Sequence, residues 1–394
     1  MADDVYYDPY DVGIDADPYP VYRRLREEAP LYYNEKHGFY AVSRFDDAEA
    51  GLNDTRTFIS GRGAILELIK ADMEFPPGVI IFEDPPLHTV HRKLLSGIFT
   101  PRKVLALEPK IRDFCARSLD RLTGADGFDF IADLGAQVPM RTIGMLLGIP
   151  EADQEAIRDR VDDNLRTEEG KPMELDLDFL AGEAFGQYID WRADNPSDDI
   201  MTDLLQAEFE DETGTRRRLT REEILTYVTV VAGAGNETTN RLIGWTGKVL
   251  ADHPAQRREL AADPALIPAA IEELLRYEPP AHHMARYMTR DVELHGQVVP
   301  AGSSMLFLTG SANRDDRRFP DGDTFDIHRR PGQTLTFGKG AHFCLGAALA
   351  RLEGRIVLEE ILKRFPEWEV DTAAAELAPT STVRGWATLP VRLP

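Results

Sequence analysis

The chain has 394 residues, 43% of them hydrophobic, and a formal net charge of −23 at pH 7. This excess of acidic residues argues against a generally basic surface that would bind nucleic acid. There is no uncharged apolar run of about eighteen residues, and the N-terminus lacks the basic-then-apolar order of a signal peptide. We therefore expect no membrane anchor and a cytoplasmic location. Cys115 and Cys344 are the only cysteines, too few for a disulfide framework or a multi-cysteine metal cluster.

Helical patterns dominate the sequence, and the extended segments are short. In the N-terminal quarter, residues 22–28 have the spacing of an amphipathic helix, whereas residues 39–42 form a short extended run. No repeat and no low-complexity linker divides the chain. We therefore expect residues 1–394 to form a single domain that is mainly α with minor β.

A long stretch interrupted by proline and glycine covers residues 60–86. It contains many large apolar side chains, among them Ile80 and Phe82. Long loops without secondary structure of their own are uncommon in compact domains and often have a function. The composition of this stretch therefore predicts a functional loop.

The strongest helical pattern extends from about residue 220 to about residue 252. Thr220 and Glu223 have the spacing of a capping box at its start, and Pro254 follows its end. Between these ends, apolar or small side chains recur every three or four positions. They form one continuous stripe, which includes Ile224, Val228, Val231, Ala234, Thr238, Leu242, Trp245 and Val249.

Two glycines, Gly233 and Gly235, interrupt the middle of this helix. In a helix interior each glycine costs about 1 kcal/mol relative to alanine, so another feature should compensate. A closely approaching ligand would do so, as would a local opening of the helix in which Thr238 or Thr239 bonds back to a carbonyl. Tight packing against another helix explains the glycines equally well.

A second helix of interest covers roughly residues 268–278 and ends before two prolines. Glu273 and Arg276 are three positions apart and lie on one face, where the carboxylate can accept from the guanidinium. An exposed pair on a helix surface has the same spacing. The spacing by itself leaves both interpretations open.

The most informative segment surrounds Cys344, and a helical run begins directly after it. Backbone N–H groups and the positive end of that helix favour the thiolate form of the cysteine. Gly338 and Gly346 permit tight turns and the close approach of a flat cofactor, while Phe337 can limit water near the sulfur. We expect Cys344 to be a metal ligand, whereas Cys115 in an amphipathic run is expected to be an inert buried side chain.

The pattern Phe-Gly-x-Gly-x-His-x-Cys-x-Gly over residues 337–346 resembles the haem-binding signature of the cytochrome P450 superfamily, especially its soluble bacterial members. Further similarities follow the order of this family along the chain. Residues 234–239 resemble its oxygen-activating helix motif, and residues 325–329 resemble its meander. Glu273 and Arg276 match its ion pair. The resemblance covers nearly the entire chain.

This resemblance implies a triangular fold that holds haem b between the long central helix and the cysteine loop with its following helix. Cys344 would be the axial ligand of the haem iron, and a thiolate ligand favours cleavage of the O–O bond. Glu237 and Thr238 would be the catalytic pair that delivers protons to bound oxygen. Residue 237 is glutamate where many relatives have aspartate, which changes the reach of the acid by one methylene.

The resemblance also implies the remaining contacts of the cofactor. Arg329 would join Glu273 and Arg276 in a charged structural network. Residues 84–92 resemble a helix start that meets the haem propionates. The cofactor-binding residues implied in addition to Cys344 are His88, Arg92, Ala234, Arg286, Phe337, Gly338, His342 and Gly346.

The activity implied is that of a monooxygenase that inserts one atom of O2 into a small lipophilic substrate, such as a terpenoid, a steroid or a fatty acyl chain. The pocket walls expected by family position are mainly apolar. They include residues 165–180 and, by name, Ile80, Phe82, Val231, Ala234, His283 and Trp386.

Electrons would come from a ferredoxin, which a ferredoxin reductase reduces with NAD(P)H. An acidic ferredoxin would dock near Cys344 on basic residues, namely Lys93, Arg102, Lys103, Lys339 and Arg351. We expect the protein to be a monomer. Two alternatives stay open, a peroxygenase that uses hydrogen peroxide and a non-catalytic haem sensor, and the pair Glu237 and Thr238 favours the monooxygenase over both.

Overall fold

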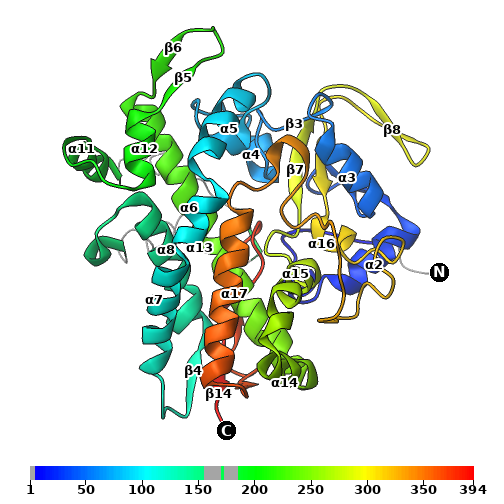
Figure 1. Cartoon of the computed structure of the whole chain (residues 1–394). Helices are drawn as coiled ribbons and strands as arrows, with labels where there is room; N and C mark the ends of the chain where they lie inside the picture. The colour runs from blue at the N-terminus through cyan, green and yellow to red at the C-terminus, as the bar shows by residue number, and fades with distance from the viewer. Residues whose placement is uncertain (1–4, 155–169, 173–184) are drawn as a thin grey trace.

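The computed structural model describes residues 5–154, 170–172 and 185–394 of the chain. In these residues the chain is rich in helices and carries several small sheets (Figure 1). The α-helices are α1 (Val12–Ala16), α2 (Tyr19–Glu28), α3 (Phe45–Asn53), α4 (Leu66–Ala71), α5 (Leu87–Ile98), α6 (Pro101–Ala106), α7 (Glu108–Asp120), α8 (Val138–Leu147), α11 (Gly186–Asp194), α12 (Ile200–Gln206), α13 (Arg221–Asp252), α14 (Pro254–Ala262), α15 (Ile267–Tyr277), α16 (Thr309–Ala312) and α17 (Ala347–Arg364).

The strands and the short helical turns complete the described elements. The strands are β1 (Leu31–Asn34), β2 (Phe39–Val42), β3 (Phe58–Ile59), β4 (Gly127–Asp129), β5 (Glu208–Glu210), β6 (Arg216–Arg218), β7 (Met284–Met288), β8 (Val292–Leu294), β9 (Gln297–Val299), β10 (Ser304–Phe307), β11 (Glu369–Val370), β12 (Glu376–Leu377), β13 (Trp386–Thr388) and β14 (Pro390–Arg392). The turns of 3-10 or π helix are η1 (Ile80–Phe82), η2 (Phe130–Gly135), η3 (Glu151–Asp153), η5 (Pro264–Leu266) and η6 (Gly340–His342).

The largest sheet has five strands in the order β1-β2-β10-β7-β3. β2 and β10 run parallel, with Tyr40 opposite Met305, and the other neighbouring strands are antiparallel. Every residue of β10 is buried, as expected for a strand in the middle of a covered sheet. α3 and α4 pack against this sheet, and α16 packs against α2 and α3. The sheet and the N-terminal helices lie together on the right-hand side of the molecule in Figure 1.

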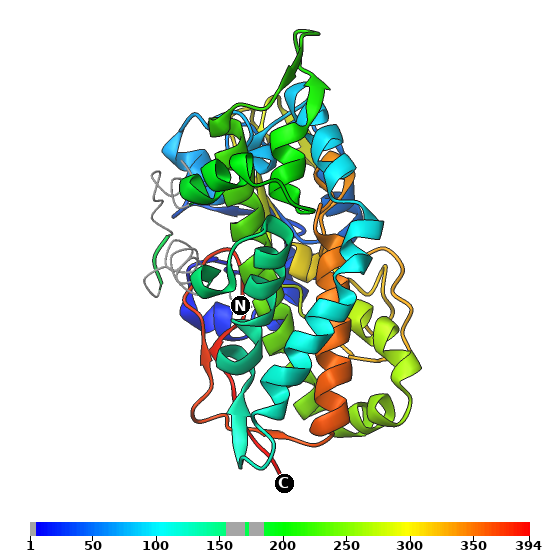
Figure 2. The same ribbon diagram turned by 60° about the vertical axis from the view of Figure 1, so that its left-hand side comes forward.

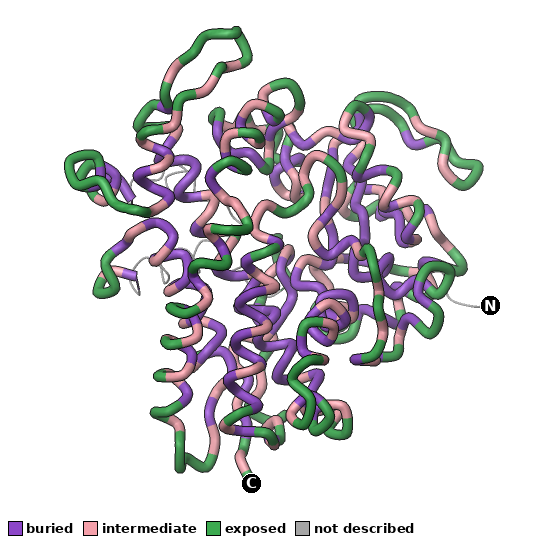
Figure 3. Tube along the Cα trace, in the orientation of Figure 1, coloured by how far each residue is buried: buried purple, intermediate pink, exposed green. Residues whose placement is uncertain are grey.

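Helix α13, which has 32 residues, lies at the centre of the helical part. It packs against α8, η2, α15 and α17, and α17 packs in turn against α7 and α15. Figures 1 and 2 both show α13 and α17 side by side, and Figure 3 shows long buried segments in this region. Because α13 is buried on several faces, it forms part of the core and is not a surface helix with a single buried stripe.

The start of α13 follows from its sequence. The Thr220 hydroxyl accepts from the N–H of Glu223, and the Glu223 carboxylate accepts from the N–H of Thr220 at 2.8 Å. These two bonds satisfy backbone donors that the first turn leaves without partners. The capping box predicted from the spacing of Thr220 and Glu223 is therefore confirmed.

Gly235, Gly244 and Gly247 of α13 allow close approach of neighbouring elements. A Cβ atom at Gly235 would lie 2.6 Å from Cδ1 of Ile143 in α8, and one at Gly247 would lie 2.7 Å from the ring of Phe130 in η2. A Cβ atom at Gly233 would have no neighbour within 4 Å among the described residues. Tight packing therefore explains Gly235, whereas no described residue packs against Gly233, and α13 is helical without a break.

The predicted loop over residues 60–86 differs from expectation because it contains α4 and η1. Leu66, Leu68 and Ile69 of α4 are buried, and this helix packs against β7 and β10. Six residues make fewer than two helical turns. A helical period therefore does not stand out in so short a segment.

Other predicted elements are confirmed. The extended run at residues 39–42 is β2, the helix expected over residues 268–278 is α15, and the chain is mainly α with minor β. Within the three described ranges, no helix combines the length and the apolar character that a membrane span requires.

Candidate active site

Cys344 lies between η6 and the first turn of α17. Burial has the largest influence on its thiol and raises the thiol pKa, while N–H groups of Gly346 and Ala347 and the charges of Arg92 and Arg351 act in the opposite direction. The side chain is still accessible to solvent. The helix start alone therefore does not stabilise the thiolate in this chain. A bound metal cation would supply the missing stabilisation.

Phe337 and Gly338 shape the loop that precedes the cysteine. The Phe337 carbonyl accepts from the N–H of Cys344 at 2.8 Å, and the guanidinium of Arg351 lies 4.5 Å from the centre of the Phe337 ring. Gly338 has a φ of 68°, in the left-handed region that favours glycine. The loop therefore holds an apolar ring close to the cysteine backbone.

Four side chains with nitrogen donors gather beside this loop: His88 and Arg92 from α5, Arg286 from β7 and His342 from η6. The His88 and His342 rings are 4.2 Å apart between centres, and Nε2 of each is buried without a hydrogen-bond partner among the described residues. Burial lowers the pKa of His342 to about 3, and repulsion from Arg286, His88 and Arg92 adds to this effect. Burial also lowers the pKa of His88, and it lowers the pKa of Arg286 to about 10.

Among the described residues, these four donors have few hydrogen-bond acceptors. Arg286 donates to the carbonyl of its own neighbour Ala285 at 2.7 Å. The carboxylate that attracts Arg286 belongs to Asp84, and it already accepts the N–H groups of Ser60 and Gly61 at 2.9 and 2.7 Å. Two further carboxylates would accept from the buried nitrogens and neutralise the guanidinium charges. Haem b carries two propionates, so the residues present fit this cofactor.

One face of α13 carries small residues that are open to solvent. Ala234 is exposed, Val231 and Thr238 are half-buried, and the open space at Gly233 lies beside them. Thr238 Oγ1 donates to the carbonyl of Ala234 at 2.8 Å, so the predicted bond back to a carbonyl forms within an unbroken helix. The hydroxyl oxygen keeps its capacity to accept a hydrogen bond.

Glu237 is 3% exposed, and its Oε1 accepts from Nη2 of Arg241 at 2.5 Å. Arg241 also donates to the carbonyl of Trp386. Oε2 of Glu237 is buried without a partner among the residues described. Arg241 was not identified from the sequence, although its spacing of four from Glu237 is that of a helix ion pair. Proton delivery by Glu237 and Thr238 stays a prediction.

The structure brings Glu273, Arg276 and Arg329 together. Glu273 accepts two hydrogen bonds from Arg276, at 2.7 Å each, and one from Nε of Arg329 at 3.1 Å. The side chains of Glu273 and Arg276 are 0% exposed. Arg276 also donates to the carbonyls of Asn313 and Gly322 at 2.9 and 2.7 Å. A buried network therefore links α15 to the segment before the cysteine loop.

The predicted pocket residues near η1 form a partly open apolar group. Ile80 is buried, while Phe82 is half-buried and packs against the tilted ring of Phe75, with ring centres 4.5 Å apart. Of the predicted wall over residues 165–180, all but residues 170–172 lies outside the described residues.

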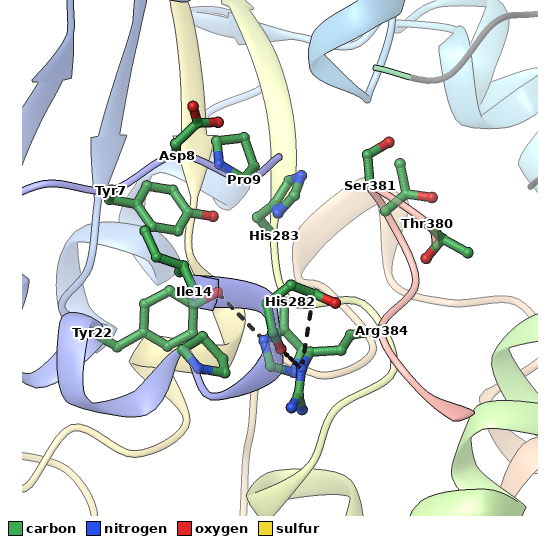
Figure 4. A pocket seen from close by; sticks show the side chains of 13 residues that line it. Tyr7, Asp8, Pro9, Ile14, Tyr22, His282, His283, Thr380, Ser381 and Arg384 are labelled. Carbon is green, nitrogen blue, oxygen red and sulfur yellow. Dashed lines mark hydrogen bonds and ion pairs between the residues drawn. The ribbon is translucent and has the colours of Figure 1, made fainter. Parts of the chain in front are cut away.

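Two other predicted pocket residues border separate hollows. His283 is buried and, with Tyr22 and Arg384, borders a cavity of about 30 Å³, which has room for about two water molecules (Figure 4). Trp386 packs on Trp245, with ring centres 5.3 Å apart, and borders a groove of about 540 Å³. The structure therefore places these two residues around different spaces.

The basic residues expected to bind a redox partner are of two kinds. Lys93 and Arg102 are exposed, and α6, which carries Arg102, packs against α17. The other three pair with carboxylates: Lys103 with Asp203, Lys339 with Glu49 and Arg351 with Glu272. Lys93 and Arg102 are thus the more accessible charges.

Comparison with known proteins agrees with the motifs. The model of the cytochrome P450 family matches residues 183–391. The chain is 35% identical over 385 residues to cytochrome P450 monooxygenase PikC of Streptomyces venezuelae, covering 96% of this chain and 91% of PikC. The solved structure of CYP109Q5 from Chondromyces apiculatus is similar, with a TM-score of 0.87, 34% identity and 98% of each chain covered.

A second solved structure, CYP109E1 from Bacillus megaterium in complex with testosterone, has a TM-score of 0.85 and 30% identity, and the match covers 97% of this chain and 99% of that one. These similarities extend over almost the whole length of both proteins. The chain therefore belongs to the cytochrome P450 family, and it is a haem-thiolate monooxygenase of the bacterial type.

Proposed function

We propose that this cytochrome P450 inserts one atom of O2 into a small lipophilic substrate of terpenoid, steroid or fatty-acyl type, with electrons from a ferredoxin. The observation that carries the proposal is the accessible face of α13, where the Thr238 hydroxyl lies beside Ala234 and Val231. A small-residue face with one alcohol suits an apolar molecule next to a proton donor. The testosterone complex of CYP109E1 supports a lipophilic substrate class.

The chain's own residues would hold the cofactor in the following way. Cys344 would bind the haem iron through its thiolate, and the haem, when bound, supplies the activation of dioxygen. The propionates would accept hydrogen bonds and charge from His88, Arg92, Arg286 and His342. Phe337 would limit the access of water to the cysteine sulfur.

Glu237 and Thr238, which lie on α13, would deliver the protons that the reaction needs. The Thr238 hydroxyl can accept a hydrogen bond from an ordered water and hold it beside Ala234. Arg241 holds Oε1 of Glu237, while Oε2 can take up a proton from solvent water and pass it to that ordered water. The alcohol would therefore position the water, and the carboxylate would relay the proton.

The electrons would come from a ferredoxin that an NAD(P)H-dependent reductase reduces. Lys93 and Arg102 are exposed on α5 and α6, and α6 packs on the helix that follows Cys344. Acidic groups on a ferredoxin would be attracted to these two charges in spite of the net charge of −23.

A screen of ligands tests the substrate class. Binding of a molecule that displaces water from the haem iron changes the spin state and hence the optical spectrum. We expect a terpenoid, a steroid or a fatty acid to cause this change, and the same molecule to be hydroxylated when ferredoxin, reductase and NADPH are added. If no lipophilic compound shifts the spectrum while small polar compounds do, the proposed substrate class is wrong.

Substitution of Thr238 tests the proposed reaction. In Thr238→Ala, nicotinamide oxidation should continue, but hydrogen peroxide should replace hydroxylated product, because protons no longer reach the correct oxygen. Thr229→Ala is a matched control, since Thr229 makes the same type of bond, to Leu225 at 2.9 Å, at a buried position of α13. An unchanged ratio of product to nicotinamide in Thr238→Ala, with wild type equally active on hydrogen peroxide alone, would point to a peroxygenase instead.

A further inference from the structure

A carboxylate and an imidazole form a buried pair outside the residues considered so far. Glu83 is 6% exposed and His91 is 0% exposed. Nδ1 of His91 lies 2.8 Å from both carboxylate oxygens of Glu83, and the N–H of Gly78 donates to Oε1 of Glu83 at 2.6 Å. Such a pair is costly to bury unless its hydrogen bonds are satisfied. Its presence therefore calls for an explanation.

The pair of Glu83 and His91 helps to hold residues 78–83 against α5 and α13. Glu83 directly follows η1, and His91 lies in the middle of α5. Gly78 has a φ of 104°, and a Cβ atom there would lie 3.3 Å from Cγ2 of Thr226 in α13. The edge of the His91 ring meets the Tyr227 ring of α13, with ring centres 5.6 Å apart. Residues 78–83 are therefore held between α5 and α13.

The same loop touches the cysteine segment. The backbone of Glu83 lies close to the His342 ring and slightly opposes the lowering of its pKa. Between Gly78 and Glu83, the loop carries Ile80 and Phe82, the two residues expected to line the substrate pocket. The contacts of Gly78 and Glu83, at the two ends of this short segment, therefore fix the positions of Ile80 and Phe82.

We propose that Glu83 and His91 are positioning residues that hold Ile80 and Phe82 as one wall of the substrate pocket and so determine how large a substrate binds. The inference rests on the proposed function, since it assumes a lipophilic substrate above the haem. Removing the His91 donor leaves a buried carboxylate without its main partner, which is more costly than losing an ordinary hydrogen bond. The loop then undocks, and any ligand that needs the wall binds only to the docked fraction.

Two substitutions at His91 separate the donor from the volume of the side chain. His91→Leu removes the N–H that faces Glu83, whereas the amide of His91→Asn can donate from nearly the position of Nδ1. The binding of two haem-coordinating probes is measured by optical difference spectra. Imidazole is too small to reach the wall, whereas the three phenyl rings of clotrimazole are large enough to contact it. Phe82→Ala shows whether contact with the wall contributes to clotrimazole binding.

We expect His91→Leu to weaken clotrimazole binding about tenfold, the loss of one buried hydrogen bond to a charged group, with imidazole binding within about twofold of wild type. His91→Asn should restore clotrimazole binding to within about threefold of wild type. Hydrogen exchange of residues 76–83, measured by mass spectrometry, should be faster in His91→Leu and close to wild type in His91→Asn. His295→Asn, which breaks the exposed pair of His295 with Asp47, should change neither measurement.

Three outcomes overturn the inference, and they distinguish two faults, one in the proposed pocket and one in the positioning role. If imidazole causes no spectral change in wild type, or if Phe82→Ala binds clotrimazole as wild type does, the proposed pocket itself is wrong. If Phe82→Ala weakens clotrimazole but His91→Leu does not, the pocket stands and the positioning role fails. Should His91→Leu not fold, Glu83→Gln takes its place, because it keeps the volume and weakens the acceptor.

Discussion

Cys344 and Cys115 show how the surroundings of a side chain decide its chemistry. Cys115 lies on the buried face of α7 and is 0% exposed. Burial raises the pKa of its thiol well above the ordinary range. Burial also raises the pKa of the Cys344 thiol, but this side chain is accessible, and two backbone N–H groups and the charges of Arg92 and Arg351 act in the opposite direction. The same thiol is therefore inert in one place and suited to bind a metal in the other.

The first residue-scale prediction follows from this contrast. Cys344→Ala should abolish the red-shifted Soret band of the reduced carbon monoxide complex, because that band requires a thiolate ligand. Cys115→Ala should keep the band, with at most a modest loss of stability from the small cavity it leaves. The optical spectrum of each reduced protein under carbon monoxide checks both expectations. A band that survives in Cys344→Ala would assign the iron ligand elsewhere.

Glu353 supports a second prediction at this scale. This residue of α17 is 1% exposed, and burial raises its pKa to about 8, partly opposed by the Thr142 hydroxyl. The folded protein therefore keeps a proton on Glu353 that the unfolded chain releases near pH 4.5. The stability contributed by this group is full below about pH 4.5 and falls as the pH rises toward 8, by on the order of 4 kcal/mol.

We expect Glu353→Gln to be more stable than wild type at pH 8, with an advantage that shrinks toward pH 5. The difference in melting temperature between Glu353→Gln and wild type should be larger at pH 8 than at pH 5 by at least about 3 °C. Glu369→Gln, at an exposed position, is the control and should show no such trend. If the advantage of Glu353→Gln is the same at both pH values, Glu353 is ionised in the folded protein.

At the scale of elements, the network of Glu273, Arg276 and Arg329 joins α15 to a distant segment. Glu273→Ala would leave the guanidinium of Arg276 buried without its partner, at a cost of about 3 to 5 kcal/mol. The adjacent Glu272 is a matched control, because its pair with Arg351 is more than 30% exposed on both sides. Glu272→Ala should therefore cost about 1 kcal/mol or less.

Haem content and melting temperature measure the difference between these two variants. Glu273→Ala should be purified with little haem and a clearly lower melting temperature, whereas Glu272→Ala should resemble wild type. Equal behaviour of the two variants would show that burial of the Glu273 network contributes nothing to the holoprotein.

At the scale of the whole molecule, the protein has a net charge of −23, but Lys93 on α5 and Arg102 on α6 are exposed positive charges. Neutralising both, in Lys93→Gln with Arg102→Gln, should slow reduction by an acidic ferredoxin about tenfold at low salt, and added salt should remove the difference. Lys103→Gln should have a smaller effect, since Lys103 already pairs with Asp203. Stopped-flow reduction rates over a range of salt concentrations check this. Equal rates in all variants would place the docking surface elsewhere.

Some features of this protein follow from the sequence alone because they depend on neighbours within a few residues. The capping box of Thr220 and Glu223 is one case, since backbone geometry brings residues three apart together at a helix start. The spacing of Glu273 and Arg276 and the glycine-rich segment around Cys344 are others. Patterns of this kind determine elements, caps and the identity of the cysteine segment.

Other features depend on the tertiary structure, because packing alone brings distant segments into contact. Glu273 meets Arg329 across 56 positions, and the carbonyl of Trp386 meets Arg241 across 145. Glu83 and His91 are only eight positions apart, yet their pairing needs the turn of η1 and the packing of both segments on α13. Gly233 and Gly235 of α13 have different roles for the same reason, since Ile143 packs at Gly235 and no described residue packs at Gly233. A local pattern specifies which residues are present on a face, but only the arrangement of neighbouring elements decides what that face contacts.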